Sequence, residues 1–304
     1  VLAALTGLGL SAAAGFNAYI PFLIMALLAR FTDIVNLPTG WEWMESWWAI
    51  GVGAVLHPDE VPDAEARFDD AVPANIRELL AHTSWKERLQ GAQELGAYVR
   101  ATPVDAELLA RFLGKYPGWK ESNFQVLNEV YRVLQCVAQD EAASVSFDRA
   151  AAALTIPALC DKLGDLKLKS NASDTLYVYA EAVSPGFVVA RALPALAALK
   201  APKAQAEAVQ WLEQLLLAFG TRGVPIADFV AYLLTALKSA NAAVRANATK
   251  AIGTLARFVG TPLQAMLGDD LNAQLRASLE AEIAAHAGDA PAPTRFVRTR
   301  GEAE

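Results

Sequence analysis

Two tryptophans with charged neighbours are the residues of this sequence best suited to holding a partner. Trp85 lies in "TSWKERL" and Trp119 in "PGWKESN", and each is followed at once by a lysine. Their spacing is close to one unit of a helical repeat. An indole ring offers a large apolar area with a polar N–H, which suits the centre of an interface. The chemistry that these residues predict is binding, not bond making.

The sequence contains no motif or residue spacing typical of a catalytic or metal site. The three histidines, His57, His82 and His286, do not lie at metal-ligand spacing from cysteine or carboxylate residues. No phosphate-loop, zinc-protease or serine-hydrolase motif occurs. Cys136 and Cys160 form no CxxC pair, lie in apolar runs and fit buried small hydrophobic residues of a reducing compartment. We therefore expect no enzyme activity, no metal and no cofactor.

The charge balance favours a protein partner. Lysine and arginine number 26 and the acidic residues 33 among 304, so the formal net charge is −7. Bulk charge of this sign attracts neither nucleic acid nor anionic lipid, although a local basic edge still attracts an acidic protein.

The first 57 residues differ sharply in composition from the rest. Residues 1–29 contain no charged residue, and a bilayer-spanning helix needs about 20 apolar residues. We therefore expect an N-terminal hydrophobic helical segment over 1–57 that inserts in a membrane and whose second span, 47–56, is cut short. Residues 58–72 are acidic and proline-containing, as in a linker. A genuine fusion and a chimera of two genes both fit this change.

From residue 73 onward apolar residues recur at helical spacing, and no strand pattern occurs. The expected helices are 73–82, 85–100, 105–114, 122–139, 147–163, 172–183, 186–199, 204–219, 225–238, 243–259 and 262–286. Helix pairs at intervals of about 40 residues are typical of HEAT repeats, which bury their faces only against their neighbours. The sequence thus predicts an all-α HEAT-repeat solenoid over 73–288, followed by a flexible tail over 289–304.

The turns inside the expected helix pairs share a basic character. In a solenoid such turns stack along one edge. Their aromatic and basic residues are Trp85, Lys86, Arg88, Trp119, Lys120, Lys167, Lys169, Lys200, Lys203 and Arg245. We predict that this edge binds an acidic partner, with the tryptophans as anchors.

Each of these residues also fits a plainer structural role. A lysine alone fits a solvated surface, and Arg245 fits the capping of nearby carbonyls. Trp85 fits a partly buried helix start. The tight turn at Pro117-Gly118 would also fit a Trp119 ring that is tucked inward.

Residues 58–304 resemble a TOG domain of the XMAP/Dis/ch-TOG microtubule polymerases, most closely the third TOG domain of the animal proteins. The strings that carry the resemblance are "SWKERL", "PGWKESNFQVL", "LCDKLGDLKLKSNA", "KAPKAQAEAVQWL", "AYLLTALKSANAAVR" and "APTR", in family order and spacing. The resemblance implies a flat stack of six armadillo-like HEAT units whose intra-repeat turns bind curved αβ-tubulin.

The resemblance also implies roles for individual residues. Trp85 would contact β-tubulin with Lys86 beside it, and Arg245 would reach α-tubulin. The residues that would face the acidic tubulin surface between them are Trp119, Lys120, Lys167, Lys169 and Lys203. The implied setting is the cytoplasm and cytoskeleton, at microtubules, spindle poles or centrosomes, in microtubule polymerisation and spindle organisation.

Residues 1–57 resemble the start of a bacterial integral-membrane family of unknown function, through "LAALTGLGLSAAAGFNAYIPFL" and "LPTGWEWMES". The alternative function is a general HEAT-repeat scaffold for another acidic protein, tethered to a membrane by residues 1–57. A single TOG domain is expected to hold tubulin but not to act alone as a processive polymerase.

Overall fold

The computed structural model describes residues 67–139, 147–267, 271, 273–286 and 289–298. The chain divides into two compact units, Val1–Ala66 and Arg67–Glu304. The predicted membrane segment over 1–57 lies outside the described residues. Within the described ranges, no helix is both long enough and apolar enough to cross a bilayer.

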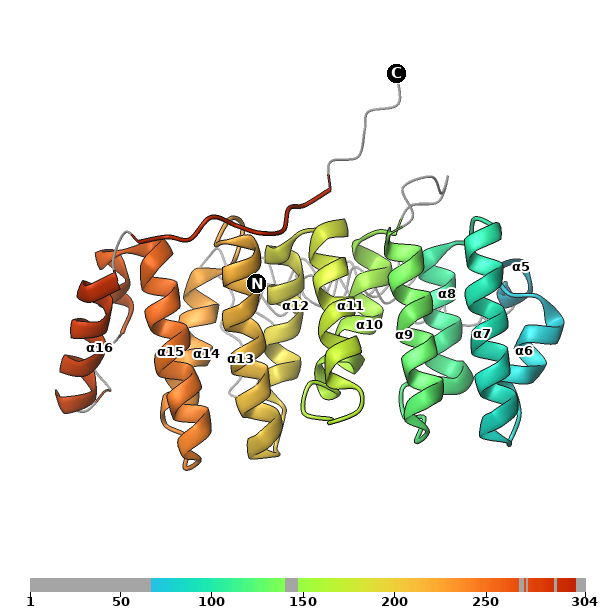
Figure 1. Ribbon diagram of the computed structural model, residues 1–304, viewed down its shortest axis with the longest axis horizontal. Helices are drawn as coiled ribbons and strands as arrows, with labels where there is room; N and C mark the ends of the chain where they lie inside the picture. Colours follow the sequence, from blue (N-terminus) through green and yellow to red (C-terminus); the bar gives the residue numbers. More distant parts are fainter. Residues whose placement is uncertain (1–66, 140–146, 268–270, 272, 287–288, 299–304) are drawn as a thin grey trace, which may run out of the picture. The chain divides into compact units, whose positions relative to one another are not determined.

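In its described residues the second unit is built from helices joined by turns and ends in a non-helical tail over 289–298 (Figure 1). The helices are α5 (Phe68–Ala71), α6 (Ala74–Ala81), α7 (Trp85–Ala101), α8 (Ala106–Leu113), η3 (Gly114–Gly118), α9 (Phe124–Gln139), α10 (Arg149–Asp161), α11 (Lys169–Ala182), α12 (Pro185–Ala197), α13 (Pro202–Phe219), α14 (Ile226–Leu237), α15 (Ala242–Val259), η4 (Thr261–Met266) and α16 (Ala273–His286). The predicted all-α HEAT-repeat solenoid is confirmed.

The helices form two layers, each made by one member of every pair. In one layer α7 packs on α9, α9 on α11, and α13 on α15; in the other α8 packs on α10, α10 on α12, and α12 on α14. Each helix therefore contacts only its own pair and the adjacent ones, as expected of a solenoid. The core lies between the layers and includes Trp211, whose exposed fraction is 4%.

Side chains that cap the amino ends fix where several helices begin. Asp105 accepts from the Leu108 amide at 3.0 Å, and Asp148 from the Ala151 amide at 3.0 Å. Asn241 caps α15 by accepting from the amides of the second and third helical residues. Such caps satisfy amide groups that have no partner inside the helix. The helix starts, and with them the turns before them, are thus set locally.

The helical unit begins before residue 73, inside the range expected to be a linker. Phe68 of α5 is buried and packs edge-to-face on Phe112, with the ring centroids 5.4 Å apart. An aromatic ring of this size contributes substantially when it is buried. The acidic residues around Phe68 hid this contact from the composition argument. The boundary at 57/58 itself stays a prediction.

The described part of the C-terminal tail is docked, which differs from the flexible tail expected over 289–304. The amides of Thr294 and Arg295 donate to the Ala218 carbonyl, both at 2.9 Å, and the Arg298 amide donates to the Glu181 carbonyl at 2.8 Å. The Arg295 guanidinium reaches the Glu181 carboxylate at 2.9 Å. The tail therefore crosses the carboxyl ends of α13 and α11 (Figure 1). Carbonyls at helix ends lack partners within the helix, and here they accept from the amides of the tail.

Candidate partner-binding edge

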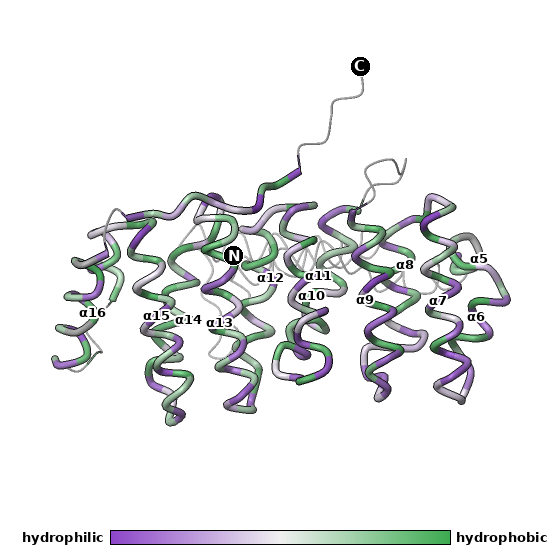
Figure 2. The backbone as a smooth tube through the Cα atoms, viewed as in Figure 1, coloured by the Kyte–Doolittle hydropathy of each residue, from purple (hydrophilic) through white to green (hydrophobic). Residues whose placement is uncertain are grey.

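The turns inside the helix pairs lie along one edge of the second unit, opposite the docked tail (Figure 1). We call it the turn edge, and it consists of turn 1 (82–84), turn 2 (114–123), turn 3 (162–168), turn 4 (198–201) and turn 5 (238–241) with the first residues of each following helix. Figure 2 shows hydrophobic as well as hydrophilic segments along it. The mixture suits a contact surface better than a purely solvated one.

Turn 1 presents a tryptophan to solvent. Trp85 is the first residue of α7, and 39% of it is exposed. Lys86 beside it is exposed as well. An indole in this position keeps apolar area available for a partner. Both residues are exposed on the turn edge, and their role in binding stays a prediction.

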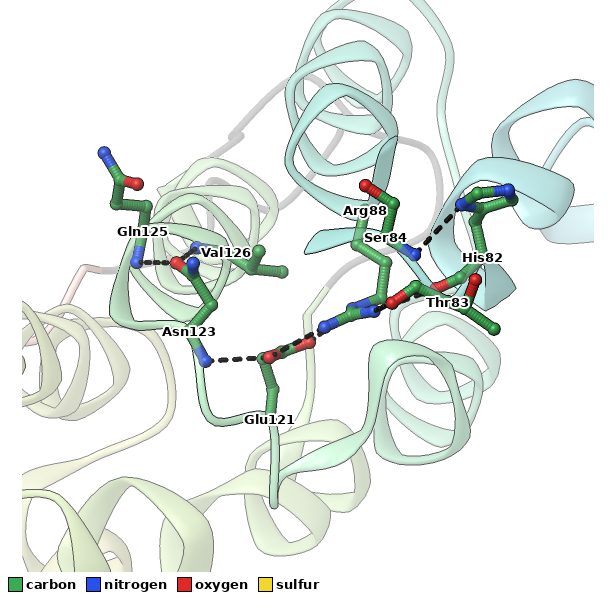
Figure 3. Close-up of polar contacts among 8 residues, drawn as sticks. All are labelled: His82, Thr83, Ser84, Arg88, Glu121, Asn123, Gln125 and Val126. Atoms are coloured by element: carbon green, nitrogen blue, oxygen red, sulfur yellow. Dashed lines mark hydrogen bonds and ion pairs between the residues drawn. The ribbon is translucent and has the colours of Figure 1, made fainter. Parts of the chain in front are cut away.

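Turn 1 is held by Arg88 (Figure 3), which lies three residues after Trp85 in α7. Its Nη1 donates to the His82 carbonyl at 2.9 Å and to the Thr83 carbonyl at 2.7 Å. Its Nε and Nη2 donate to the Glu121 carboxylate of turn 2 at 2.5 and 3.1 Å. A guanidinium is suited to such forked recognition because its donors have a fixed planar geometry.

Glu121 is ionised and largely covered. Its side chain is 3% exposed, and its Oε1 also accepts from the Asn123 amide at 2.8 Å. Burial raises the pKa of Glu121, but the hydrogen bonds from Arg88 and from the Asn123 amide, with the Arg88 charge, lower it more. The net pKa therefore lies below the usual glutamate value, and the pair with Arg88 is charged at neutral pH.

The ring of Trp119 is tucked back against its own repeat. The residue is half-buried, and its Nε1 lies 3.0 Å from the point where a Cβ on Gly114 would stand. Gly118 has a φ of +86°, a conformation that favours glycine, and it turns the chain so that the indole folds over. Lys120, the next residue after Trp119, is exposed. Turn 2 thus offers a lysine more openly than its aromatic ring.

Turn 3 holds a leucine outward. The Asp165 carboxylate accepts from the Lys167 and Leu168 amides at 2.7 and 3.1 Å, and Leu168 is buried below. Leu166, which lies between Asp165 and Lys167, is 75% exposed. The Lys167 ammonium lies 4.2 Å from the ring centroid of Phe124, which is itself 36% exposed. Leu166 and Phe124 are candidate contact residues that the sequence argument missed.

The basic residues nearer the other end are not equally available. Lys169 forms an ion pair with Glu207 of α13 at 3.0 Å, so its charge is matched across turns 3 and 4. Lys200 and Lys203 are exposed. Arg245 is exposed too, but its Nη1 donates to the Ser239 and Ala240 carbonyls, both at 2.8 Å. The capping expected as the alternative for Arg245 therefore occurs, while much of the residue still faces solvent.

Polar bonds between repeats link helices of the layer that contains α9, α11, α13 and α15. Asn171 donates to the Asn128 carbonyl at 3.0 Å, and Gln135 donates to Asn171 Oδ1 at 2.7 Å. Asn247 donates to the Ala206 carbonyl at 2.9 Å. Because these bonds link successive repeats, the turns are held relative to one another. Among the described residues no cluster of histidine, cysteine, aspartate or glutamate suits a metal ion.

Residues 70–283 match the family described as XMAP215/Dis1/CLASP, TOG domain. The chain belongs to this family. The rice protein MOR1 is 31% identical over 252 residues, and the Drosophila melanogaster protein mini spindles is 28% identical over 249 residues. Each comparison covers 80% of this chain but 12% of the relative, so the chain spans about an eighth of the length of these proteins.

Solved structures agree with the family. The third TOG domain of Drosophila melanogaster Mini spindles has a TM-score of 0.63 and 29% identity, covering 74% of this chain and 100% of that one. The predicted resemblance to a third TOG domain is confirmed. A structure from work on TOG–tubulin binding specificity has a TM-score of 0.62 and 17% identity, covers 74% of this chain and 87% of that one, and shows the fold alone. Residues 4–61 match a domain of unknown function, DUF4126.

Proposed function

We propose that the TOG domain of this chain binds αβ-tubulin through the turn edge and thereby regulates microtubule dynamics and organisation. The observation that carries the proposal is the exposure of Trp85 at one end of this edge and of Arg245 at the other. Between them the edge offers apolar and cationic groups on a row of turns, which complement a large acidic protein. The protein acts as a binding module without enzyme activity, in the cytoplasm and on microtubules, spindle poles or centrosomes.

The proposed roles follow the exposure of the side chains. Trp85 and Lys86 contact β-tubulin, and Arg245 contacts α-tubulin. The groups proposed to face the surface between these ends are Lys120, Lys167, Lys203, Phe124 and Leu166. Trp119 and Lys169 contribute less, because the first folds over Gly114 and the second is paired with Glu207.

The test is a double variant of the full chain, Trp85→Glu with Arg245→Ala. We expect it to stop co-eluting with αβ-tubulin in size-exclusion chromatography and to keep the helical circular dichroism of the wild type. A matched control is Phe296→Glu with Arg222→Ala, which makes the same change of charge on exposed residues away from the turn edge. The control should bind as the wild type does.

Two results would contradict the proposal. Co-elution of the Trp85 variant with tubulin at wild-type strength would show that the edge is the wrong site. Wild-type protein that retains a different acidic protein from cell lysate, and not tubulin, would favour the general scaffold instead. The first outcome requires that the variant keeps its helical content, and the second is measured on the wild type.

A further inference from the structure

We propose that Arg88 is a positioning residue, which sets the place of Trp85 on the turn edge by fastening turn 1 to turn 2 through Glu121. The inference rests on the proposed binding of tubulin and adds a residue whose effect is indirect. Arg88 is 17% exposed and Glu121 3% exposed in their side chains. Neither is therefore well placed to touch a partner as Trp85 is.

Arg88 lies close to Trp85 and holds the backbone that leads into it. Trp85 opens α7 and Arg88 follows three residues later, on the same face of the helix. The bonds from Arg88 run back to the carbonyls of His82 and Thr83, the two residues before the helix cap (Figure 3). The Ser84 amide in addition donates to His82 Nδ1 at 3.1 Å. The backbone on both sides of the turn is thus fixed.

Glu121 links turn 1 to turn 2. The Glu121 carboxylate receives both Arg88 and the Asn123 amide, and Asn123 Oδ1 in turn accepts from the Gln125 amide at 2.8 Å at the start of α9 (Figure 3). One chain of bonds therefore runs from the carbonyls of turn 1 to the first turn of α9. An open hollow of about 390 Å³ lies between the two turns, so apolar packing does not fill the space between them. This chain of bonds therefore adds a polar link between turn 1 and turn 2 to the packing of α7 on α9.

Arg245 at turn 5 makes bonds to its own turn that resemble those of Arg88. Arg245 is the fourth residue of α15, as Arg88 is of α7, and it binds the two equivalent carbonyls of its own turn. In the described part of the chain, Arg245 has no carboxylate partner comparable to Glu121. The same local brace thus occurs twice, and only at turn 1 is it extended to the neighbouring repeat. The extension serves the turn that carries the exposed tryptophan.

The perturbation is Glu121→Gln, which keeps the shape and removes the charge. One carboxylate oxygen becomes an NH₂ group. In the place of Oε2 it loses the bond from Arg88 Nε, and in the place of Oε1 it loses the bonds from Arg88 Nη2 and the Asn123 amide, so at least one bond of the chain is lost. We expect the Kd for αβ-tubulin to rise about tenfold, as for coupled neighbouring groups. The matched control is Glu129→Gln on α9, whose partner Arg132 lies one turn along the same helix and away from the turns. The control should stay within twofold of wild type.

A double-mutant cycle separates positioning from direct contact. In a Trp85→Ala background, Glu121→Gln should change the Kd by less than twofold, because the residue that it positions is gone. A full tenfold effect in that background would overturn the inference. Arg88→Lys keeps the charge but not the fork, so it should weaken binding as Glu121→Gln does. If Arg88→Lys binds tubulin with wild-type affinity, the positive charge alone is sufficient and the forked geometry is not needed. That result would also overturn the inference.

A measurement without tubulin keeps the two proposals distinguishable. Hydrogen exchange of the full chain should show faster exchange of amides in residues 82–88 for Glu121→Gln, and unchanged exchange in residues 239–245. If the wild type fails to bind tubulin but this exchange pattern appears, the proposed partner is wrong and the turn-fastening role holds. Unchanged amide exchange at turn 1 in Glu121→Gln would contradict the positioning role, whatever the partner.

Discussion

Leu166→Ala gives a direct test of whether the middle of the turn edge makes an apolar contact. Leu166 is 75% exposed, although the turn around it is fixed by the Asp165 carboxylate and by the burial of Leu168. Fully burying a leucine side chain is worth about 1.5–3 kcal/mol. Three quarters of that area is still in water in the unbound chain, so a complex that covers it gains about 1–2 kcal/mol. The remaining quarter limits the effect on folding to about 0.5 kcal/mol.

The expected result is therefore a separation of affinity from stability. The Kd of the full chain for αβ-tubulin, measured by fluorescence anisotropy, should rise about 5- to 30-fold for Leu166→Ala. The midpoint of thermal unfolding should stay within about 2 °C of wild type. Met266→Ala is the matched control, since Met266 is 41% exposed on η4, beyond the carboxyl end of α15. Equal Kd values for the wild type and both variants would refute the apolar contact at turn 3.

Three further predictions concern the free energy of unfolding, which is measured by denaturant unfolding of the full chain. Arg295→Ala removes the partly exposed ion pair of the docked tail with Glu181 and should cost about 1 kcal/mol, whereas an unchanged midpoint would mean that this ion pair does not stabilise the fold. Gly186→Ala places a Cβ 1.9 Å from the Gly223 carbonyl oxygen of the next repeat and should cost about 3 kcal/mol or more. In Gly96→Ala the nearest atom to the new Cβ is Val133 Cγ2 at 3.6 Å, so this variant should be neutral or stabilising. Equal effects of the two variants would contradict the packing argument. The pKa of Glu121 is lowered in the folded state, so its contribution to folding stability is fully present above the ordinary value of 4.5 and is lost as pH falls through the folded pKa. Glu121→Gln should therefore flatten the dependence of stability on pH below 4.5. A stability curve parallel to that of the wild type would contradict this assignment.

The helical framework was predictable because its signal is local. Apolar positions at helical spacing indicate where a helix must face the core, and short turns at regular intervals indicate a stack of pairs. Most observed helices agree with the expected ranges within a few residues, as at 204–219, where α13 covers Pro202–Phe219. The single helix expected over 262–286 is wrong, because the structure has two separate elements there, η4 (Thr261–Met266) and α16 (Ala273–His286). Lys169 shows the limit of such boundaries, because it is the first residue of α11 and not a turn residue. Its place on the helix brings it to Glu207.

Details of the turn edge depend on contacts that the sequence pattern does not carry. Arg88 and Glu121 are far apart in the chain, and their pairing follows only from the stacking of the repeats. The inward fold of Trp119 depends on the space that Gly114 leaves. Leu166 was overlooked because the search followed tryptophans and basic residues. In "DLKLK" two leucines read alike, and only the folded turn buries Leu168 and exposes Leu166.

The turn edge is consequently not a uniform basic ridge. Lys169 is matched by Glu207, so the positive charge at the junction of turns 3 and 4 is largely balanced. Exposed apolar area instead occurs at turn 1 and around Leu166, and the cations with exposed side chains stand between and beyond these points. Apolar burial is insensitive to salt, whereas attraction between exposed charges is screened. A partner held by this edge should therefore lose association rate at high ionic strength while keeping much of its affinity, because the tryptophan and leucine contacts resist dissociation.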